Sequence, residues 1–134
     1  MNCIFCKIIN KEIPSYKIYE DEYTYAFLDI AKDVDGHTLV VPKKHCCNIL
    51  DCDETTLSHV MNTVKLISNH YVNDCGFTGV NILNASGESA QQTVFHLHVH
   101  IIPRKENDDI NSWPNFKGTK QSLESMHELL KIEK

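Results

Sequence analysis

The fold of this chain is decided by the stretch His96-Leu97-His98-Val99-His100-Ile101-Ile102-Pro103. Its histidines occupy every second position and the residues between them are apolar, which is the pattern of a β-strand with two different faces. Leu97, Val99 and Ile101 would enter a core, and the three imidazoles would line the opposite face. Two residues of a strand span roughly 6.6 Å, so the outer histidines would lie about 13 Å apart, too far for one metal ion to bind all three. The sequence therefore predicts that the three rings have different roles.

Length and composition indicate a single globular domain, residues 1–134, that does not bind nucleic acids. The formal net charge is −5, and Arg104 is the only arginine, whereas a nucleic-acid surface needs clustered basic side chains. No apolar run is long enough to span a membrane, and the first residues lack the pattern of a secretory signal. We therefore expect a cytoplasmic protein, in which the paired cysteines among the six bind a metal or carry out redox chemistry.

The periodicities along the chain predict an α+β fold with an antiparallel sheet of about five strands. Besides the histidine stretch, strands are expected over residues 17–20, 23–28, 37–41 and 80–83. Apolar residues at helical spacing predict one long helix over residues 55–75, with Asp53 as its N-cap and Gly76 at its end. A C-terminal amphipathic helix is expected over residues 123–132.

The histidine row has an ordinary alternative, which is a solvated face of the sheet. A single histidine on a strand usually has a structural role. Three in register each need a partner, because aligned imidazoles cost desolvation and repel one another when charged. The row therefore indicates a functional site.

The histidine stretch fits the signature of the histidine triad (HIT) family, His-φ-His-φ-His-φ-φ, in which φ is apolar. Four segments upstream extend the resemblance: Cys3–Ile9, Ile13-Pro14, Phe27–Ile30 and His37–His45. The chain resembles the small bacterial-type HIT hydrolases over about residues 3–104, and residues 105–134 form a C-terminal extension without a counterpart. The resemblance implies a single HIT domain with a HIT-like fold.

The resemblance also implies an activity, since proteins of this family cleave nucleotides at the α-phosphate through a nucleotidyl-histidine intermediate. His98 matches the nucleophile, and its ring would be held by the backbone carbonyl of His96. His100, in its protonated form, would hold phosphate oxygens and the leaving group, and His37 would pack behind the triad and orient it. The implied catalytic set is thus His98, His100, His37 and His96. The implied substrates are purine nucleotide derivatives, either nucleoside phosphoramidates or dinucleoside polyphosphates, with a nucleotide such as AMP or GMP bound.

Other positions match the nucleotide-binding residues of the family. Asp29 would accept hydrogen bonds from the ribose hydroxyls, and Asn84, Gln92 and Thr93 would contact phosphate beside His98 and His100. An apolar slot for the base would be formed by Phe5, Ile8, Ile13, Phe27 and Ile30, each of which is also a plausible core residue. Gln91 departs from the family pattern, because relatives usually carry glycine there.

Cys3-Ile4-Phe5-Cys6 has the spacing of half a zinc site, and by itself it also fits a redox pair. In the bacterial-type HIT proteins zinc is held by such a pair, by a histidine after the Pro-Lys end of a strand and by the first triad histidine. The matching ligands here are Cys3, Cys6, His45 and His96. A closed site of this kind is structural, so the implied cofactor is a structural Zn²⁺ that leaves His98 and His100 for phosphate.

Two alternative functions stay open at the level of the sequence. One is a nucleotide-binding signalling module that keeps the pocket with little turnover. The other treats the triad itself as a catalytic metal centre. The resemblance further implies a homodimer whose sheets join edge to edge, since an unpaired edge strand needs a partner or other protection.

Overall fold

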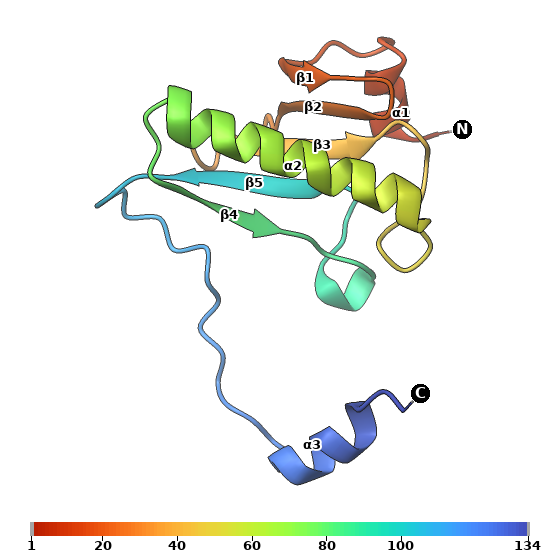
Figure 1. Cartoon of the computed structure of the whole chain (residues 1–134), viewed down its shortest axis with the longest axis vertical. Coiled ribbons are helices and arrows are strands. Elements are labelled where there is room, and N and C mark those ends of the chain that lie inside the picture. The colour runs from red at the N-terminus through yellow and green to blue at the C-terminus, as the bar shows by residue number, and fades with distance from the viewer. Residues whose placement is uncertain (1, 134) are drawn as a thin grey trace.

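The computed structural model describes residues 2–133 and contains a five-stranded antiparallel sheet with one long helix packed across a face of it (Figure 1). The strands are β1 (Lys17–Glu20), β2 (Thr24–Leu28), β3 (Thr38–Pro42), β4 (Gly79–Leu83) and β5 (Val99–Arg104), in the spatial order β1-β2-β3-β5-β4. The helices are α1 (Ile4–Ile9), α2 (Glu54–Asp74) and α3 (Leu123–Leu130), with the 3₁₀ turn η1 (Glu88–Ala90) before β5. The predicted α+β architecture is confirmed.

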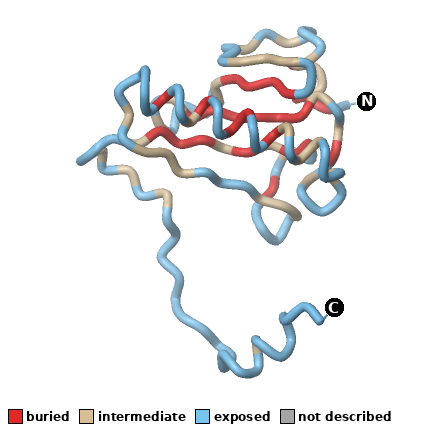
Figure 2. The backbone as a smooth tube through the Cα atoms, in the orientation of Figure 1, coloured by how far each residue is buried: buried red, intermediate tan, exposed pale blue. Residues whose placement is uncertain are grey.

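Successive side chains along each strand point to opposite faces of the sheet, so the core has two parts, one on each face. Under α2 lie Ala26, Val40, Val99 and Ile101, packed against Val60, Val64, Ile67 and Tyr71. Under α1 lie Tyr25, Phe27, Leu39 and Val41, packed against Phe5 and Ile8. The buried residues follow the central strands and the facing side of α2 (Figure 2), and fully burying one such side chain stabilises the fold by about 2 kcal/mol. His100 pairs with Leu39 across β3 and β5, which places it on the α1 face.

The long helix α2 agrees with its sequence pattern. It begins after Asp53, whose side chain accepts a hydrogen bond of 3.0 Å from the backbone N–H of Thr56. It ends at Asp74 with Cys75 as its C-cap, and Gly76 follows with φ +84°, a conformation that glycine adopts without strain. Val60, Val64 and Ile67 and their helical neighbours bury one face of α2 on the sheet.

The histidine stretch differs from its prediction, because β5 begins at Val99 and not at His96. The backbone N–H of Leu97 bonds to the carbonyl of Cys46 at 2.8 Å, and the Asn84 side chain bonds to the carbonyl of His98 at 2.9 Å. Over residues 96–98 these contacts with loop residues take the place of the backbone hydrogen bonds between strands. Side chains still alternate, since Leu97, Val99 and Ile101 are buried as predicted. His96 also lies on the predicted face, since Phe5 of α1 packs against the rings of both His96 and His98, but His96 is fully buried and does not line the cavity that His98 and His100 line.

The strand β5 ends at Arg104, and the C-terminal segment then runs away from the sheet (Figure 1). The Arg104 guanidinium donates two hydrogen bonds of 2.9 Å to the Asp108 carboxylate and one of 2.7 Å to Asn81, so this lone arginine has a structural role. The helix α3 ends two residues earlier than predicted, and none of its residues is buried (Figure 2). Within residues 2–133, no helix has the length and apolar character that crossing a membrane requires.

Candidate functional site

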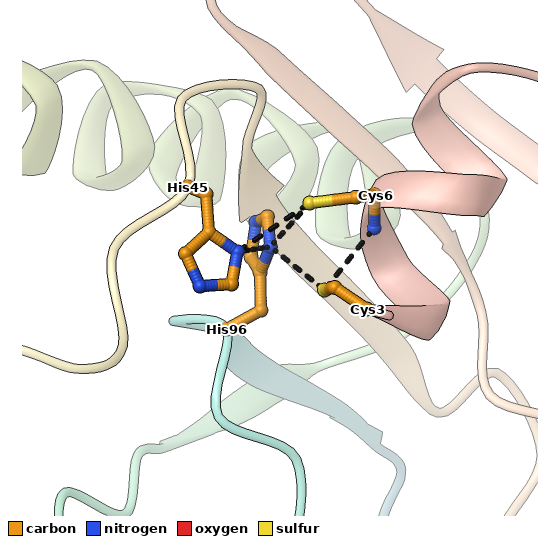
Figure 3. Close-up of side chains that lie close together, drawn as sticks. All are labelled: Cys3, Cys6, His45 and His96. Atoms are coloured by element: carbon orange, nitrogen blue, oxygen red, sulfur yellow. Dashed lines mark hydrogen bonds between the residues drawn. The ribbon is translucent and has the colours of Figure 1, made fainter. Parts of the chain in front are cut away.

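Two cysteines and two histidines from separate parts of the chain meet beside the first turn of α1 (Figure 3). Cys3 is the N-cap of α1 and Cys6 lies in its first turn, while His45 follows β3 and His96 precedes β5. The Nδ1 atom of His96 lies 3.4 Å from the Cys3 sulfur, 3.5 Å from the Cys6 sulfur and 3.1 Å from Nδ1 of His45. The Cys6 sulfur also lies 3.4 Å from Nδ1 of His45. The four residues thus direct their donor atoms at one point.

These separations match a tetrahedral metal site. Typical zinc bond lengths place a sulfur and a nitrogen ligand about 3.6 Å apart and two nitrogen ligands about 3.3 Å apart. The ring of His96 is prepared for such a role, because its Nε2–H donates to the Pro42 carbonyl at 2.8 Å and its lone pair is therefore on Nδ1. Burial lowers the pKa of His96 to about 4, so the ring is neutral, as a ligand must be.

The thiols show why a cation suits this cluster. Burial, together with the neighbouring Cys3 thiol, raises the pKa of the Cys6 thiol to about 11. Thiolates form in such a place when a bound cation stabilises them. The Nδ1 lone pairs of His45 and His96, 3.1 Å apart, would repel each other, and a cation bound between them would remove that repulsion. The residues present therefore fit a divalent metal that accepts sulfur and nitrogen, and the group of four can bind a metal.

His98 stands outside this cluster. Its Nδ1–H donates to the backbone carbonyl of His96 at 2.8 Å, which is the hydrogen bond that the family resemblance implied. A carbonyl oxygen can only accept, so the proton of the neutral ring is on Nδ1 and the lone pair is on Nε2. The edge of the ring packs on Phe5, with 5.1 Å between ring centroids. The backbone thus fixes one tautomer and one orientation of His98.

His100 and His37 form a second pair of rings beside His98. Nδ1 of His100 lies 2.9 Å from Nε2 of His37, and Nδ1 of His37 lies 2.8 Å from a carboxylate oxygen of Asp33. Burial, and then the adjoining rings of His98 and His37, lowers the pKa of His100 to about 4. The ring is therefore neutral near pH 7, and the protonated form expected at this position requires an anion beside it.

A cavity of about 340 Å³ opens between α1, β2 and the triad. It is lined by nine residues expected to bind a nucleotide, namely Phe5, Ile8, Ile13, Phe27, Asp29, Ile30, Thr93, His98 and His100. Ile30 is 77% exposed and lies at the rim, whereas Phe5 and Phe27 are buried and pack edge to face. The cavity thus has an apolar end beneath α1 and a polar end at the triad, where Asp29 and the two histidines meet.

The polar loop before β5 supports the triad. The Asn84 amide donates to the carbonyl of His98 at 2.9 Å, which leaves it one N–H. The Gln92 amide donates to the carbonyls of Cys47 and Val94 at 2.7 and 3.0 Å, and its oxygen accepts from the backbone N–H of Gly87 at 2.9 Å. Gln92 is therefore occupied in holding the loop and has no N–H to offer a phosphate, in contrast to its expected role.

Gln91 is in the left-handed region, with φ 73° and ψ 26°. Glycine adopts this conformation freely, and another residue tolerates it at a cost of roughly 1 kcal/mol. The loop geometry typical of glycine is thus retained without glycine.

Sequence reasoning missed two kinds of residue at the site. Leu39 and Val94 line the cavity, yet their patterns are those of ordinary core residues. Asp33 lies between the segments Phe27–Ile30 and His37–His45 that carry the family resemblance and belongs to neither. Its position four residues before His37 was a usable signal, since an acidic residue close to a buried histidine often orients that ring.

Comparison with known proteins agrees with this geometry. The family model described as the HIT domain matches residues 10–107. An adenosine 5'-monophosphoramidase from Saccharomyces cerevisiae is 37% identical over 135 residues, covering 98% of this chain and 83% of its own length. An adenylylsulfatase from Arabidopsis thaliana is 40% identical over 107 residues, covering 80% of this chain and 54% of its own length. Both names are those of hydrolases, so the expected enzyme class is confirmed.

Solved structures show the same fold. A protein from Streptococcus mutans, 39% identical, superposes with a TM-score of 0.84 over 96% of this chain and 82% of its own. A zinc-bound histidine triad family protein from Mycobacterium smegmatis, 34% identical, has a TM-score of 0.79 over 86% of this chain and 84% of its own. The sequence signature, the sheet and the arrangement of the three histidines lead to one conclusion: the chain belongs to the HIT family.

Proposed function

We propose that this protein hydrolyses purine nucleotide derivatives at the α-phosphate through a nucleotidyl intermediate on His98. The observation that carries the proposal is the state of that ring. His98 takes no part in the cysteine–histidine cluster, its Nδ1 is fixed by a backbone carbonyl, and the ring borders the cavity. A neutral imidazole held in this way is a competent nucleophile near pH 7.

The reaction takes two steps. Nε2 of His98 attacks the α-phosphorus as the bond to the leaving group breaks, and the leaving group departs with a proton. Water then attacks the same phosphorus, the bond to Nε2 breaks, and the nucleoside monophosphate is released. The remaining N–H of Asn84, together with Thr93 and His100, would stabilise the charge on the phosphate oxygens. Gln92 acts indirectly, by holding the loop that carries Thr93.

The cavity supports a nucleotide rather than a small phosphate ester. Phe5, Ile8 and Phe27 give it a buried apolar surface suited to the face of a base, and Ile13 and the exposed Ile30 also line it. Asp29 lines the polar end of the cavity beside the triad, and its carboxylate can accept hydrogen bonds from the two hydroxyls of a ribose. AMP and GMP both fit this description, because apolar contact with a base face discriminates little between purines.

We further propose that the metal is Zn²⁺ and that its role is structural. Cys3, Cys6, His45 and His96 would occupy all four positions, which leaves none for substrate. The ion would fasten α1, and with it the apolar wall of the cavity, to the loop that carries His98. Thiolate ligands of this kind persist in a reducing compartment, which supports a cytoplasmic location.

A homodimer is the assembly that we propose. Among residues 2–133, β4 pairs with β5 on one side and leaves its other edge open, and Ile82 and Leu83 on it are partly exposed. An open apolar edge is the kind of surface that a second copy covers. Light scattering at micromolar concentration should give the mass of two chains, and the mass of one chain would contradict this assignment.

Trapping the intermediate tests the proposed function. The protein is mixed with a nucleoside 5'-phosphoramidate, quenched within one turnover and analysed by intact mass and peptide mapping. We expect the added mass of one nucleotidyl group on His98, and none in His98→Ala. Binding of AMP without turnover would instead favour the signalling module, and turnover that persists in His98→Ala would overturn the proposal.

A further inference from the structure

A chain of three side chains runs from solvent to the triad. Asp33 lies in the loop between β2 and β3, and its side chain is 55% exposed. Its carboxylate oxygen is 2.8 Å from Nδ1 of His37, whose side chain is only 10% exposed. Nε2 of His37 is 2.9 Å from Nδ1 of His100, which lines the cavity. A surface carboxylate is thus linked to the cavity through two rings.

The carboxylate determines where the protons lie. An ionised carboxylate can only accept, so Nδ1 of His37 carries a proton and, in the neutral ring, Nε2 carries a lone pair. Nδ1–H of His100 then donates to that lone pair, and Nε2 of His100 is left without a proton. In this state His100 cannot donate to a leaving group. One added proton, shared by the two rings, turns Nε2 of His100 into a donor.

We propose that Asp33 is a positioning residue that fixes the His37 and His100 rings and stabilises the added proton, so that His100 can protonate the leaving group. This inference rests on the proposed function. Its physical basis is that of a carboxylate hydrogen-bonded behind a catalytic histidine, where the negative charge orients the ring and favours the imidazolium without itself taking the proton.

The proton balance is complete. As the bond from Nε2 of His98 to phosphorus forms, the bond from phosphorus to the leaving nitrogen breaks, and Nε2–H of His100 transfers its proton to that nitrogen. The pair of rings is then neutral. When water attacks phosphorus, its proton goes to Nε2 of His100, which restores the starting state.

The other groups around the rings leave this role to Asp33. The titratable groups that face His100 are His98, His37, Asp29 and Asp33. The carboxylate of Asp29 lies 3.7 Å from Nε2 of His37, beyond hydrogen-bond distance. Asp29, His37 and His100 are close enough to share an ion, but both nitrogens of His37 already have hydrogen-bond partners. The hydrogen bond from His37 holds the pKa of the Asp33 carboxyl below its usual value, so the carboxyl is ionised at neutral pH.

Two substrates with one nucleotide and different leaving groups test the inference. An alkylamine must be protonated to leave, whereas p-nitrophenolate leaves without a proton. Asp33→Asn retains an oxygen that accepts from His37 but removes the charge, and Asp35→Asn is the matched control, an exposed aspartate in the same loop. We expect Asp33→Asn to lower kcat for the phosphoramidate about 100-fold and to change kcat for the p-nitrophenyl ester less than about threefold. Asp35→Asn should leave both rates unchanged.

The pH profile gives a second measurement. Loss of the added proton produces the alkaline limb of kcat for the phosphoramidate, and Asp33→Asn should move that limb to lower pH by about one unit. Equal slowing of both substrates, or no slowing of either, would overturn the role of Asp33 while leaving the function of His98 intact. Failure of the unmodified protein to cleave either substrate would overturn the proposed function itself. Thermal melts of Asp33→Asn and Asp33→Ala show whether the fold is preserved.

Discussion

The two histidine environments of this molecule, four residues apart in the sequence, differ in almost every physical respect. His96 has no exposed surface and faces two sulfurs and another imidazole. His100 faces a cavity, another imidazole and the carboxylates of Asp29 and Asp33. Both rings have a pKa lowered to about 4 by burial, so burial alone does not separate their roles. Their neighbours separate them. The sulfur and nitrogen ligands around His96 favour a metal, whereas the open cavity beside His100 leaves room for a substrate.

The sharpest way to break this comparison is to remove the ring of His98 and, separately, that of His96. We expect His98→Ala to lower turnover by about 10⁴-fold or more, since a nucleophile has no substitute, and to leave the thermal midpoint nearly unchanged. His96→Ala should instead lose metal and melt at lower temperature. Initial rates, metal content and calorimetry distinguish the two, and a His98→Ala variant that loses metal or melts at a clearly lower temperature would contradict the division.

The metal side is tested by Cys3→Ser. We expect loss of zinc binding and a fall in the free energy of unfolding of about 4 kcal/mol at a free zinc concentration a thousandfold above Kd. Elemental analysis and calorimetry with and without a chelator give both quantities. Cys75→Ser is the control, because Cys75 is exposed and lies outside the cluster. Metal that persists in Cys3→Ser and tracks activity would favour a catalytic metal centre.

The substrate side is tested by Asp29→Asn. Loss of a charged acceptor for the ribose should raise KM about tenfold, with a smaller change in kcat. The same comparison with a 2',3'-dideoxynucleotide substrate isolates the contact, because the effect of the substitution should then nearly vanish. A tenfold effect that is the same for both sugars would place Asp29 elsewhere in the mechanism.

The pH dependence of stability reports on His100. Its pKa is about 4 in the folded state and 6.5 in the reference state, so the unfolded chain binds more protons between these values. The contribution of neutral His100 is therefore complete above pH 6.5 and is lost as the pH falls toward 4. We expect the free energy of unfolding to fall by about 2 kcal/mol less between pH 7.5 and 5 in His100→Asn than in the unmodified protein. Urea titrations at both pH values measure this difference.

The smallest effect is expected at Gln91, in the loop on the substrate side. Glycine removes the strain of φ 73° but adds freedom to the unfolded chain, so Gln91→Gly should raise the free energy of unfolding by at most about 1 kcal/mol. Urea unfolding measures it. A destabilisation would indicate that the Gln91 side chain makes a stabilising contact.

Much of the fold followed from local patterns. The alternation of Leu97, Val99 and Ile101 correctly predicted their burial, and the helical spacing of Val60, Val64 and Ile67 correctly predicted the buried face of α2. Both patterns work because side chains repeat with the period of their backbone, whatever the rest of the chain does. The start of β5 could not be predicted in this way, because the hydrogen bond from Leu97 to Cys46 joins segments about fifty residues apart.

The functional site, like the fold, was predictable in part from the sequence and in part depended on contacts between distant segments. The sequence by itself determined which residue types were available, a cysteine pair and a row of histidines, and the family resemblance indicated their positions. Only the tertiary structure decided that β5 begins after His98, that Gln92 is occupied by the loop and that Asp33 reaches His37. The physical reason is that a side chain's chemistry depends on the atoms within a few ångströms of it, and in this protein those atoms come from distant parts of the chain.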